Sequence, residues 1–164
     1  PRTGANGWFL RRGLHQSGQH MALRVLIAED SPTVQQSIRE LLQSADVLSV
    51  VTAGDGVEAV RLARETTPDV VILDYGMPGL NGVQAARLIR QTSPDMPLIL
   101  LTASVAEHLI AVAFSAGIRG YVLKIDAADD LIRAIYTVRR GATYVSPGAS
   151  RVLYERYLPA PRVS

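Results

Sequence analysis

The chain has 164 residues, which suits one domain with a buried core and is too short for two domains of ordinary size. Hydrophobic residues make up 48% and charged residues 20%, a balance typical of a soluble globular protein. The absence of cysteine excludes disulfides, thiolate metal sites and cysteine nucleophiles. No apolar run approaches the length that spans a bilayer, so we expect no membrane contact.

The net charge of +2 is unevenly distributed along the chain. Residues 21–138 hold 9 of the 17 basic and 14 of the 15 acidic residues, whereas the two ends are rich in arginine. An acidic centre does not attract a phosphate backbone, so this pattern argues against direct nucleic-acid binding by the central region.

Strand-like and helix-like segments alternate between Leu23 and Arg139. Short apolar runs predict strands over residues 23–28, 48–53, 69–73, 97–101 and 121–123. Helical periodicity with N-cap signals predicts helices over about residues 32–42, 57–65, 83–89, 106–116 and 128–139. This alternation predicts an α/β fold, a doubly wound five-stranded parallel sheet with helices on both faces.

The two ends differ from this pattern. Residues 1–20 have four glycines and no periodicity, and we expect a leader or a segment derived from cloning, with Met21 as the natural start. We assign the domain to residues 21–140. Residues 141–164 are expected to form a helix that begins at Ser146-Pro147 and a linker that contains Pro159 and Pro161.

The third predicted strand ends in a carboxylate. Residues 70–73 are apolar without alternation, as expected for a strand buried on both faces of a parallel sheet, and Asp74 follows directly. The carboxyl ends of such strands border the crevice where open α/β sheets bind ligands. We predict that Asp74 is a nucleophile that accepts a phosphoryl group. The alternative is an aspartate that only stabilises a turn.

Other polar residues stand at the same ends of the neighbouring strands: Glu29, Asp30, Thr102 and Lys124. Parallel strands end at one edge, so these residues are predicted to converge with Asp74 on one pocket. Three carboxylates together favour a bound cation, and oxygen ligands of this kind suit Mg²⁺. A hydroxyl and an ammonium group then suit the oxygens of a phosphoryl group. Lys124 is the only lysine of the chain.

These motifs together resemble the receiver domain of two-component response regulators over about residues 23–140. The resemblance is carried by Glu29-Asp30, Asp74 with Met77-Pro78-Gly79, Thr102-Ala103 and Tyr121-Val122-Leu123-Lys124. It implies a flavodoxin-like sheet with strand order 2-1-3-4-5. It also implies a cytoplasmic phosphoacceptor that supports its own phosphorylation and dephosphorylation and is not a turnover enzyme.

The resemblance implies a role for each residue of the pocket. Asp74 is the phosphorylation site, served by a partner histidine kinase. Thr102 and Lys124 bind the phosphoryl oxygens, and Tyr121 is the aromatic switch residue that turns inward when Thr102 moves. The ligands of Mg²⁺ are then Asp30, Asp74 and the backbone carbonyl of Gly76, with Glu29 assisting through water.

One position departs from the family pattern. Many receivers have a cis proline after the lysine, whereas Ile125 stands here. Together with residues 141–147, Gly-Ala-Thr-Tyr-Val-Ser-Pro, this feature resembles the NarL/FixJ (LuxR-type) subfamily. Members usually carry a helix-turn-helix domain next, which implies transcription regulation, homodimerisation on phosphorylation, and DNA binding only through an output domain absent here.

Three alternatives compete with this interpretation. Residues 54–59 fit the dinucleotide fingerprint G-x-G-x-x-A, with Asp74 about 20 residues further on, as that fold requires. A haloacid dehalogenase-type hydrolase would need a general acid at position 76, where Gly76 stands. The third alternative is a receiver-like scaffold that is never phosphorylated.

The other polar residues carry no site of their own. His15, His20 and His108 are too scattered for a metal site, and the acidic pair Asp129-Asp130 is interpreted as a negative charge at a helix N-terminus.

Overall fold

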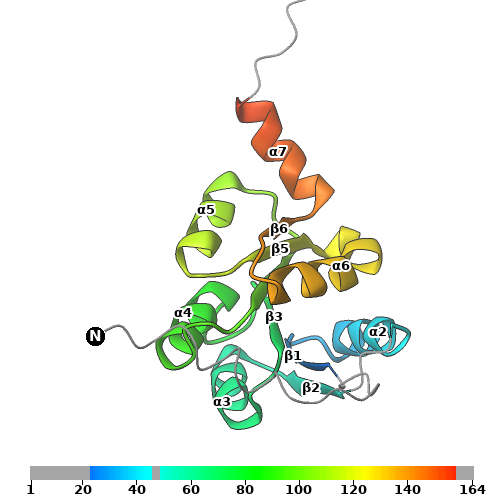
Figure 1. The fold of residues 1–164 in the computed structure, drawn as a ribbon, viewed down its shortest axis with the longest axis vertical. Helices are drawn as coiled ribbons and strands as arrows, with labels where there is room; N and C mark the ends of the chain where they lie inside the picture. Colours follow the sequence, from blue (N-terminus) through cyan, green and yellow to red (C-terminus); the bar gives the residue numbers. More distant parts are fainter. Residues whose placement is uncertain (1–22, 46–48, 158–164) are drawn as a thin grey trace, which may run out of the picture.

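In the computed structural model, which describes residues 23–45 and 49–157, one six-stranded sheet forms the centre of the molecule (Figure 1). The strands lie in the order β2-β1-β3-β4-β5-β6, and every neighbouring pair is parallel. Their bounds are β1 Arg24–Ala28, β2 Ser49–Ala53, β3 Val70–Asp74, β4 Leu98–Thr102, β5 Gly120–Leu123 and β6 Tyr144–Val145. The predicted leader 1–20 and the proline-containing linker lie outside the described residues.

Helices connect successive strands and cover both faces of the sheet. They are α2 Pro32–Gln43, α3 Gly56–Thr66, α4 Gly82–Thr92, α5 Glu107–Ser115, α6 Ala127–Arg139 and α7 Pro147–Tyr157, with a short 3₁₀ turn η1 at Lys124–Asp126. Figure 1 shows α3, α4 and α5 on one face and α2 and α6 on the other. The doubly wound fold is therefore confirmed.

Two apolar clusters fill the spaces between the sheet and the helices. Alternate residues of each central strand point to opposite faces, so Leu26 and Leu73 belong to the cluster under α3, α4 and α5. Ile27 and Ile72 belong to the cluster under α2 and α6. All five residues of β3 and all five of β4 are buried, which explains why their sequences are apolar without alternation.

The prediction of five strands is wrong by one, because the segment after α6 adds β6 to the sheet. Tyr144 and Val145 pair with Gly120 and Tyr121 of β5. The Tyr144 hydroxyl also donates to the carboxylate of Asp130 in the first turn of α6. Burial and this hydrogen bond raise the pKa of Tyr144 to about 12. Two residues are too few to show strand periodicity in a sequence.

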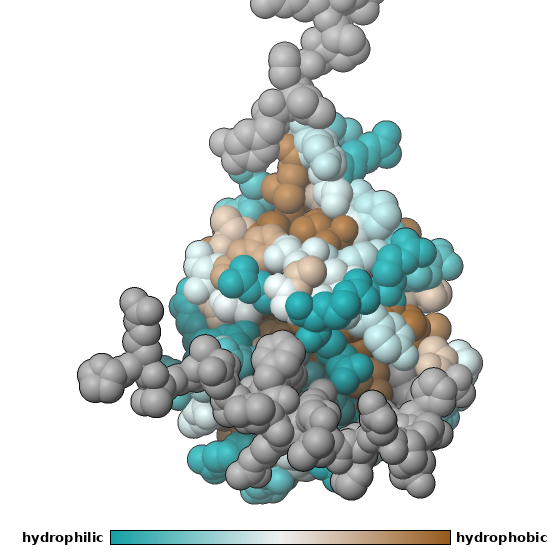
Figure 2. Space-filling model, in the orientation of Figure 1, coloured by the Kyte–Doolittle hydropathy of each residue, from teal (hydrophilic) through white to brown (hydrophobic). Residues whose placement is uncertain are grey.

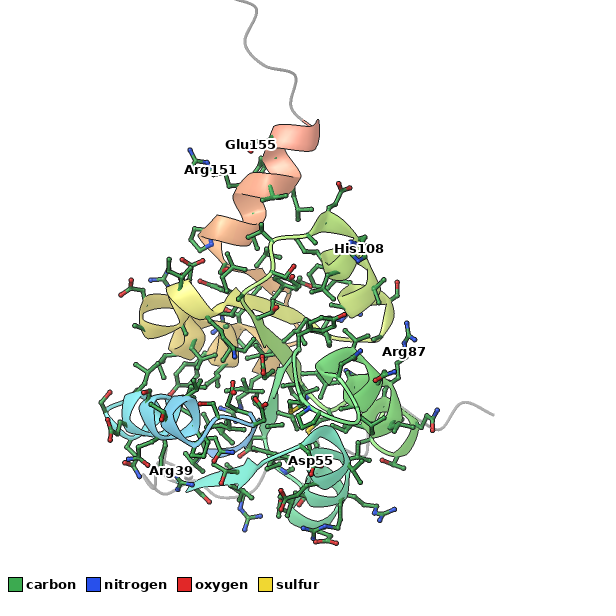
Figure 3. All side chains as sticks on the ribbon, turned by 180° about the vertical axis from the view of Figure 1, so that it is seen from behind. Arg39, Asp55, Arg87, His108, Arg151 and Glu155 are labelled. Carbon is green, nitrogen blue, oxygen red and sulfur yellow. The ribbon has the colours of Figure 1, made fainter. Side chains whose placement is uncertain are left out.

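Helix α7 begins at Pro147, as predicted, and projects from the body of the molecule (Figure 1). Figure 2 shows apolar surface along α7 and just below it. Val145 of β6 and Leu153 and Tyr154 of α7 line a hollow of about 330 Å³. Arg151 and Glu155 lie on the outer side of the helix (Figure 3), where they form an ion pair at 3.2 Å. Within residues 23–45 and 49–157, no helix combines the length and apolarity needed to cross a membrane.

A close approach between α3 and the loop after β3 requires glycine at position 56. A Cβ atom on Gly56 would collide with the backbone oxygen of Leu80 and lie 2.7 Å from its Cβ atom. The neighbouring Gly54 is different, because the only neighbour of an added Cβ would be a carboxylate oxygen of Glu58 at 3.9 Å.

We predict that Gly56→Ala lowers the free energy of unfolding by about 1–3 kcal/mol, since the Leu80 backbone must move to admit the methyl group. Urea denaturation followed by circular dichroism measures this change. Gly54→Ala serves as the matched control and should cost much less. Equal losses in the two variants would show that the Leu80 contact does not determine the choice of residue.

Candidate functional site at the carboxyl edge of the sheet

The register of the sheet brings the predicted site residues to one edge. Ala28, the last residue of β1, lies opposite Ala53 and Leu73, so Glu29 and Asp74 follow at the same level. Thr102 ends β4 opposite Leu123, which directly precedes Lys124. Residues almost a hundred positions apart are therefore neighbours because parallel strands end together.

A carboxylate cluster with one lysine forms the centre of the site. Carboxylate oxygens of Glu29, Asp30 and Asp74 lie within 4.8 Å of one another. The Lys124 Nζ atom lies 2.9 Å from Glu29 Oε2 and 3.1 Å from Asp74 Oδ1. Glu29 and Asp74 are buried, whereas Asp30 is exposed. The arrangement therefore presents carboxylate oxygens to solvent on one side and is fixed by an ammonium group on the other.

The electrostatic balance of this cluster depends on burial and on the lysine. Burial raises the pKa of Glu29 above 4.5, and the negative charge of Asp74 acts in the same direction, while the hydrogen bonds from Lys124 and Ser31 oppose the shift. For Lys124, burial works against the charged form, but its bonds to Glu29 and Asp74 outweigh burial and raise its pKa. Lys124 therefore remains protonated and compensates part of the negative charge.

The acidic loop after β1 is held by residues that the sequence did not reveal. Glu29 Oε1 accepts the backbone N–H of Ser31 at 3.0 Å. The side-chain amide of Gln35 in α2 donates to the backbone oxygen of Glu29 and to that of Ala53 at 3.2 Å. Gln35 thus ties the end of β1 to the end of β2. A glutamine on an amphipathic helix carries no signal that would identify this role.

Thr102 and Tyr121 lie beside the cluster and share contacts with one residue. The Thr102 hydroxyl oxygen accepts the backbone N–H of Ser104 at 3.1 Å, and the Tyr121 hydroxyl donates to the Ser104 oxygen at 2.8 Å. Tyr121 is fully buried, so its ring points inward, and burial together with the nearby Tyr75 raises its pKa to about 12. Gly76 is exposed just after Asp74, and an added Cβ there would lie 3.8 Å from Asp74 Oδ2.

The loop that carries Lys124 adopts its own conformation without a proline. Residues 124–126 form the 3₁₀ turn η1, and no peptide bond among the described residues is cis. The side chain of Ile125 is 87% exposed and does not pack into the site. With Ile125 in place of the proline, the loop is thus a 3₁₀ turn that leads directly into α6.

In the segment that matches the dinucleotide fingerprint, residues 54–59, two backbone N–H groups donate to carboxylates of the same segment. Asp55 accepts the backbone N–H of Glu58 at 2.8 Å, and the Glu58 side chain accepts the N–H of Gly54 at 2.8 Å. The Glu58 N–H is one of the amide groups at the amino end of α3 that a pyrophosphate would need. The glycine at 56 is explained by its approach to Leu80. The dinucleotide interpretation is therefore rejected.

The other polar residues that the sequence analysis considered, His108 and the pair Asp129-Asp130, lie away from the carboxylate cluster, on α5 and α6. His108 lies exposed on the outer surface of α5 (Figure 3). Asp129 and Asp130 stand in the first turn of α6, as predicted, but Asp130 is buried and additionally accepts the hydroxyl of Tyr144.

The fold and the site define a class of protein: a doubly wound α/β domain with an acidic, lysine-containing pocket at the carboxyl edge of its sheet. Residues 25–136 match the response regulator receiver domain family, and the chain belongs to that family. The chain is 33% identical to a nitrate/nitrite response regulator protein homolog of Haemophilus influenzae over 82% of its residues. It is 36% identical to the transcriptional regulatory protein LnrK of Bacillus subtilis over 76%. The chain covers 65% and 57% of the lengths of these relatives.

Solved structures agree with this assignment and with the NarL/LuxR-type resemblance. A LuxR-family two-component response regulator from Aurantimonas sp. SI85-9A1 superposes with a TM-score of 0.79 at 33% identity and covers 84% of this chain and 99% of that one. The RcsB response regulator in complex with DNA matches with a TM-score of 0.74 at 26% identity, covering 86% of this chain and 72% of that chain.

The raised pKa of Glu29 predicts a pH-dependent cost of folding in metal-free buffer. The folded state keeps the Glu29 proton to a higher pH than the unfolded chain, so this group makes stability fall as pH rises from about 4.5 through its folded pKa. Glu29→Gln should remove that fall. The free energy of unfolding of the variant minus that of the wild type should therefore increase with pH across this range and then level off.

Urea denaturation at a series of pH values measures this difference. The control is Glu40→Gln, which changes an exposed glutamate on α2. The same pH profile in both variants would contradict the assignment of this cost to the buried carboxylate.

Proposed function

We propose that this domain is a phosphoacceptor in which Asp74 receives a phosphoryl group from the phosphohistidine of a histidine kinase. An oxygen of Asp74 attacks the phosphorus atom, the nitrogen–phosphorus bond breaks with its electrons returning to the imidazole, and an acyl phosphate forms. The proposal is supported above all by the ion pair of Lys124 Nζ with Asp74 Oδ1 at 3.1 Å, because this ammonium is already placed where phosphoryl oxygens would arrive.

Mg²⁺ is the metal that the carboxylate cluster fits best. Oxygen donors within 4.8 Å and an exposed Asp30 provide ligands and access to water, which Mg²⁺ retains in its shell. Asp30, Asp74 and the backbone carbonyl of Gly76 would hold it, with Glu29 assisting through water. A bound Mg²⁺ would neutralise charge on the phosphoryl oxygens during transfer. Thr102 and Lys124 then contact the remaining oxygens from the protein side.

Phosphorylation acts as a switch through β4 and β5. The Thr102 hydroxyl gives up its bond to the Ser104 N–H when it turns to the phosphoryl group. Tyr121 already points inward and bonds the Ser104 oxygen, so its position responds when Ser104 is released. The response is a shift between two arrangements of the protein, biased by the added charge. The domain is a signalling element that supports its own phosphorylation and dephosphorylation and does not turn over a substrate.

The relatives suggest the wider setting. Because LnrK is a transcriptional regulatory protein and both relatives are longer than this chain, we propose a cytoplasmic protein that regulates transcription through a DNA-binding output domain. We further propose that phosphorylation promotes homodimerisation of the receiver.

We predict that acetyl phosphate with Mg²⁺ adds one phosphoryl group per chain and that Asp74→Asn abolishes this addition. Intact-protein mass spectrometry measures the product. Asp95→Asn is the control, because Asp95 is an exposed carboxylate between α4 and β4, at the opposite edge of the sheet, and should leave phosphorylation unchanged. If the wild-type protein takes up no phosphate, the receiver-like scaffold that is never phosphorylated becomes the better description.

The dimer is tested separately. Light scattering should show the mass of the wild-type protein double on addition of Mg²⁺ with beryllofluoride, a phosphoryl mimic, and remain that of a monomer for Asp74→Asn. An unchanged mass in wild type that binds beryllofluoride would remove the dimer from the proposal and leave the phosphoacceptor in place.

A further inference from the structure

The amino end of α7 is attached to the loop that carries Lys124. The backbone N–H of Leu123, the residue before the lysine, donates to the hydroxyl oxygen of Ser146 at 3.1 Å. Two residues after the lysine, the carboxylate of Asp126 accepts the backbone N–H of Gly148 at 3.3 Å. Both flanks of Lys124 are therefore connected to residues 146–148 and, through them, to the first turn of α7.

This attachment is tightly packed. Ser146 and Ala149 are completely buried. A Cβ atom at Gly148 would lie 2.7 Å from Leu123 Cδ1 and 3.0 Å from Asp126 Oδ2, so a larger residue there would displace these two side chains. The backbone N–H of Ser146 also donates to the oxygen of Tyr121 at 2.9 Å, which continues the sheet to this point.

The two residues after Lys124 neither pack into the site nor cap the helix that follows them. Ile125 is 87% exposed and contributes little packing. Lys124 reaches across the site to Glu29 and Asp74, and a long, flexible side chain can do so only if its backbone is placed correctly. Asp126 is the N-cap residue of α6, yet its side chain makes no capping bond to that helix and reaches α7 instead.

We propose that Ser146 and Asp126 are positioning residues for the phosphoacceptor site. By fixing the backbone on either side of Lys124, they aim its ammonium group at Asp74 and at the phosphoryl group that Asp74 receives. This inference rests on the proposed function, in which Lys124 contacts the phosphoryl oxygens. The carboxylates of the metal cluster come from the ends of β1 and β3, so they stay in place when the Lys124 loop moves, and only the ammonium group beside them is displaced.

The test compares two ligands of the full chain. Calorimetric titration measures beryllofluoride affinity in the presence of Mg²⁺, and electron paramagnetic resonance measures the affinity for Mn²⁺ alone. We expect Ser146→Ala and Asp126→Ala to weaken beryllofluoride binding about fivefold, as for a displaced hydrogen bond. Mn²⁺ affinity should not fall, since its carboxylate ligands are untouched and a displaced Lys124 removes positive charge beside them.

Asp129→Ala is the matched control, because Asp129 is an exposed aspartate on the same helix and should leave both affinities unchanged. If Ser146→Ala does not fold, Asp126→Ala decides alone, since it changes a partly exposed side chain. Parallel loss of both affinities, or no loss of beryllofluoride affinity, would overturn the positioning role. Failure of the wild type to bind beryllofluoride would instead overturn the proposed function.

Discussion

The arrangement of the site depends on the ion pairs of Lys124 with Glu29 and Asp74. Three carboxylates within 4.8 Å repel one another, and burial of two of them increases the cost of their charges. The single lysine of the chain lies between two of these groups and compensates part of their negative charge. The parallel sheet makes this possible, because it brings the ends of distant strands to one edge. A bound metal ion and a phosphoryl group would act on a balance of charges that these four side chains already establish.

The parts of the site that lie at strand ends were predictable from sequence. Asp74 follows a run of buried apolar residues, and in a parallel sheet the residues after such runs must share an edge. The contacts that support those residues were not predictable. Gln35 looks like any exposed helical glutamine, and its bonds to the ends of β1 and β2 exist only in the folded chain. The same holds for Ser146, whose sequence position suggested a helix cap but whose hydroxyl serves the backbone of β5.

The glycine-rich segment at residues 54–59 shows how packing can decide between two interpretations of one motif. In sequence, its glycines suggest a phosphate-binding turn. In the structure, Gly56 permits contact with Leu80. The carboxylates of Asp55 and Glu58 accept hydrogen bonds from two backbone N–H groups of the same segment. A sequence pattern records that glycine is needed but not which neighbour requires it, and only the tertiary structure identifies that neighbour.

The short strand β6 also has a practical consequence for work with this chain. It covers the outer side of β5, where Gly120 and Tyr121 would otherwise present unpaired backbone groups. Exposed strand edges of this kind are templates for pairing with other molecules. A fragment that stops before Tyr144 would keep the residues of the phosphoacceptor cluster but lose the contacts of residues 146–148 with the Lys124 loop, and it would be prone to self-association. An expression boundary placed after α7 is therefore the safer choice.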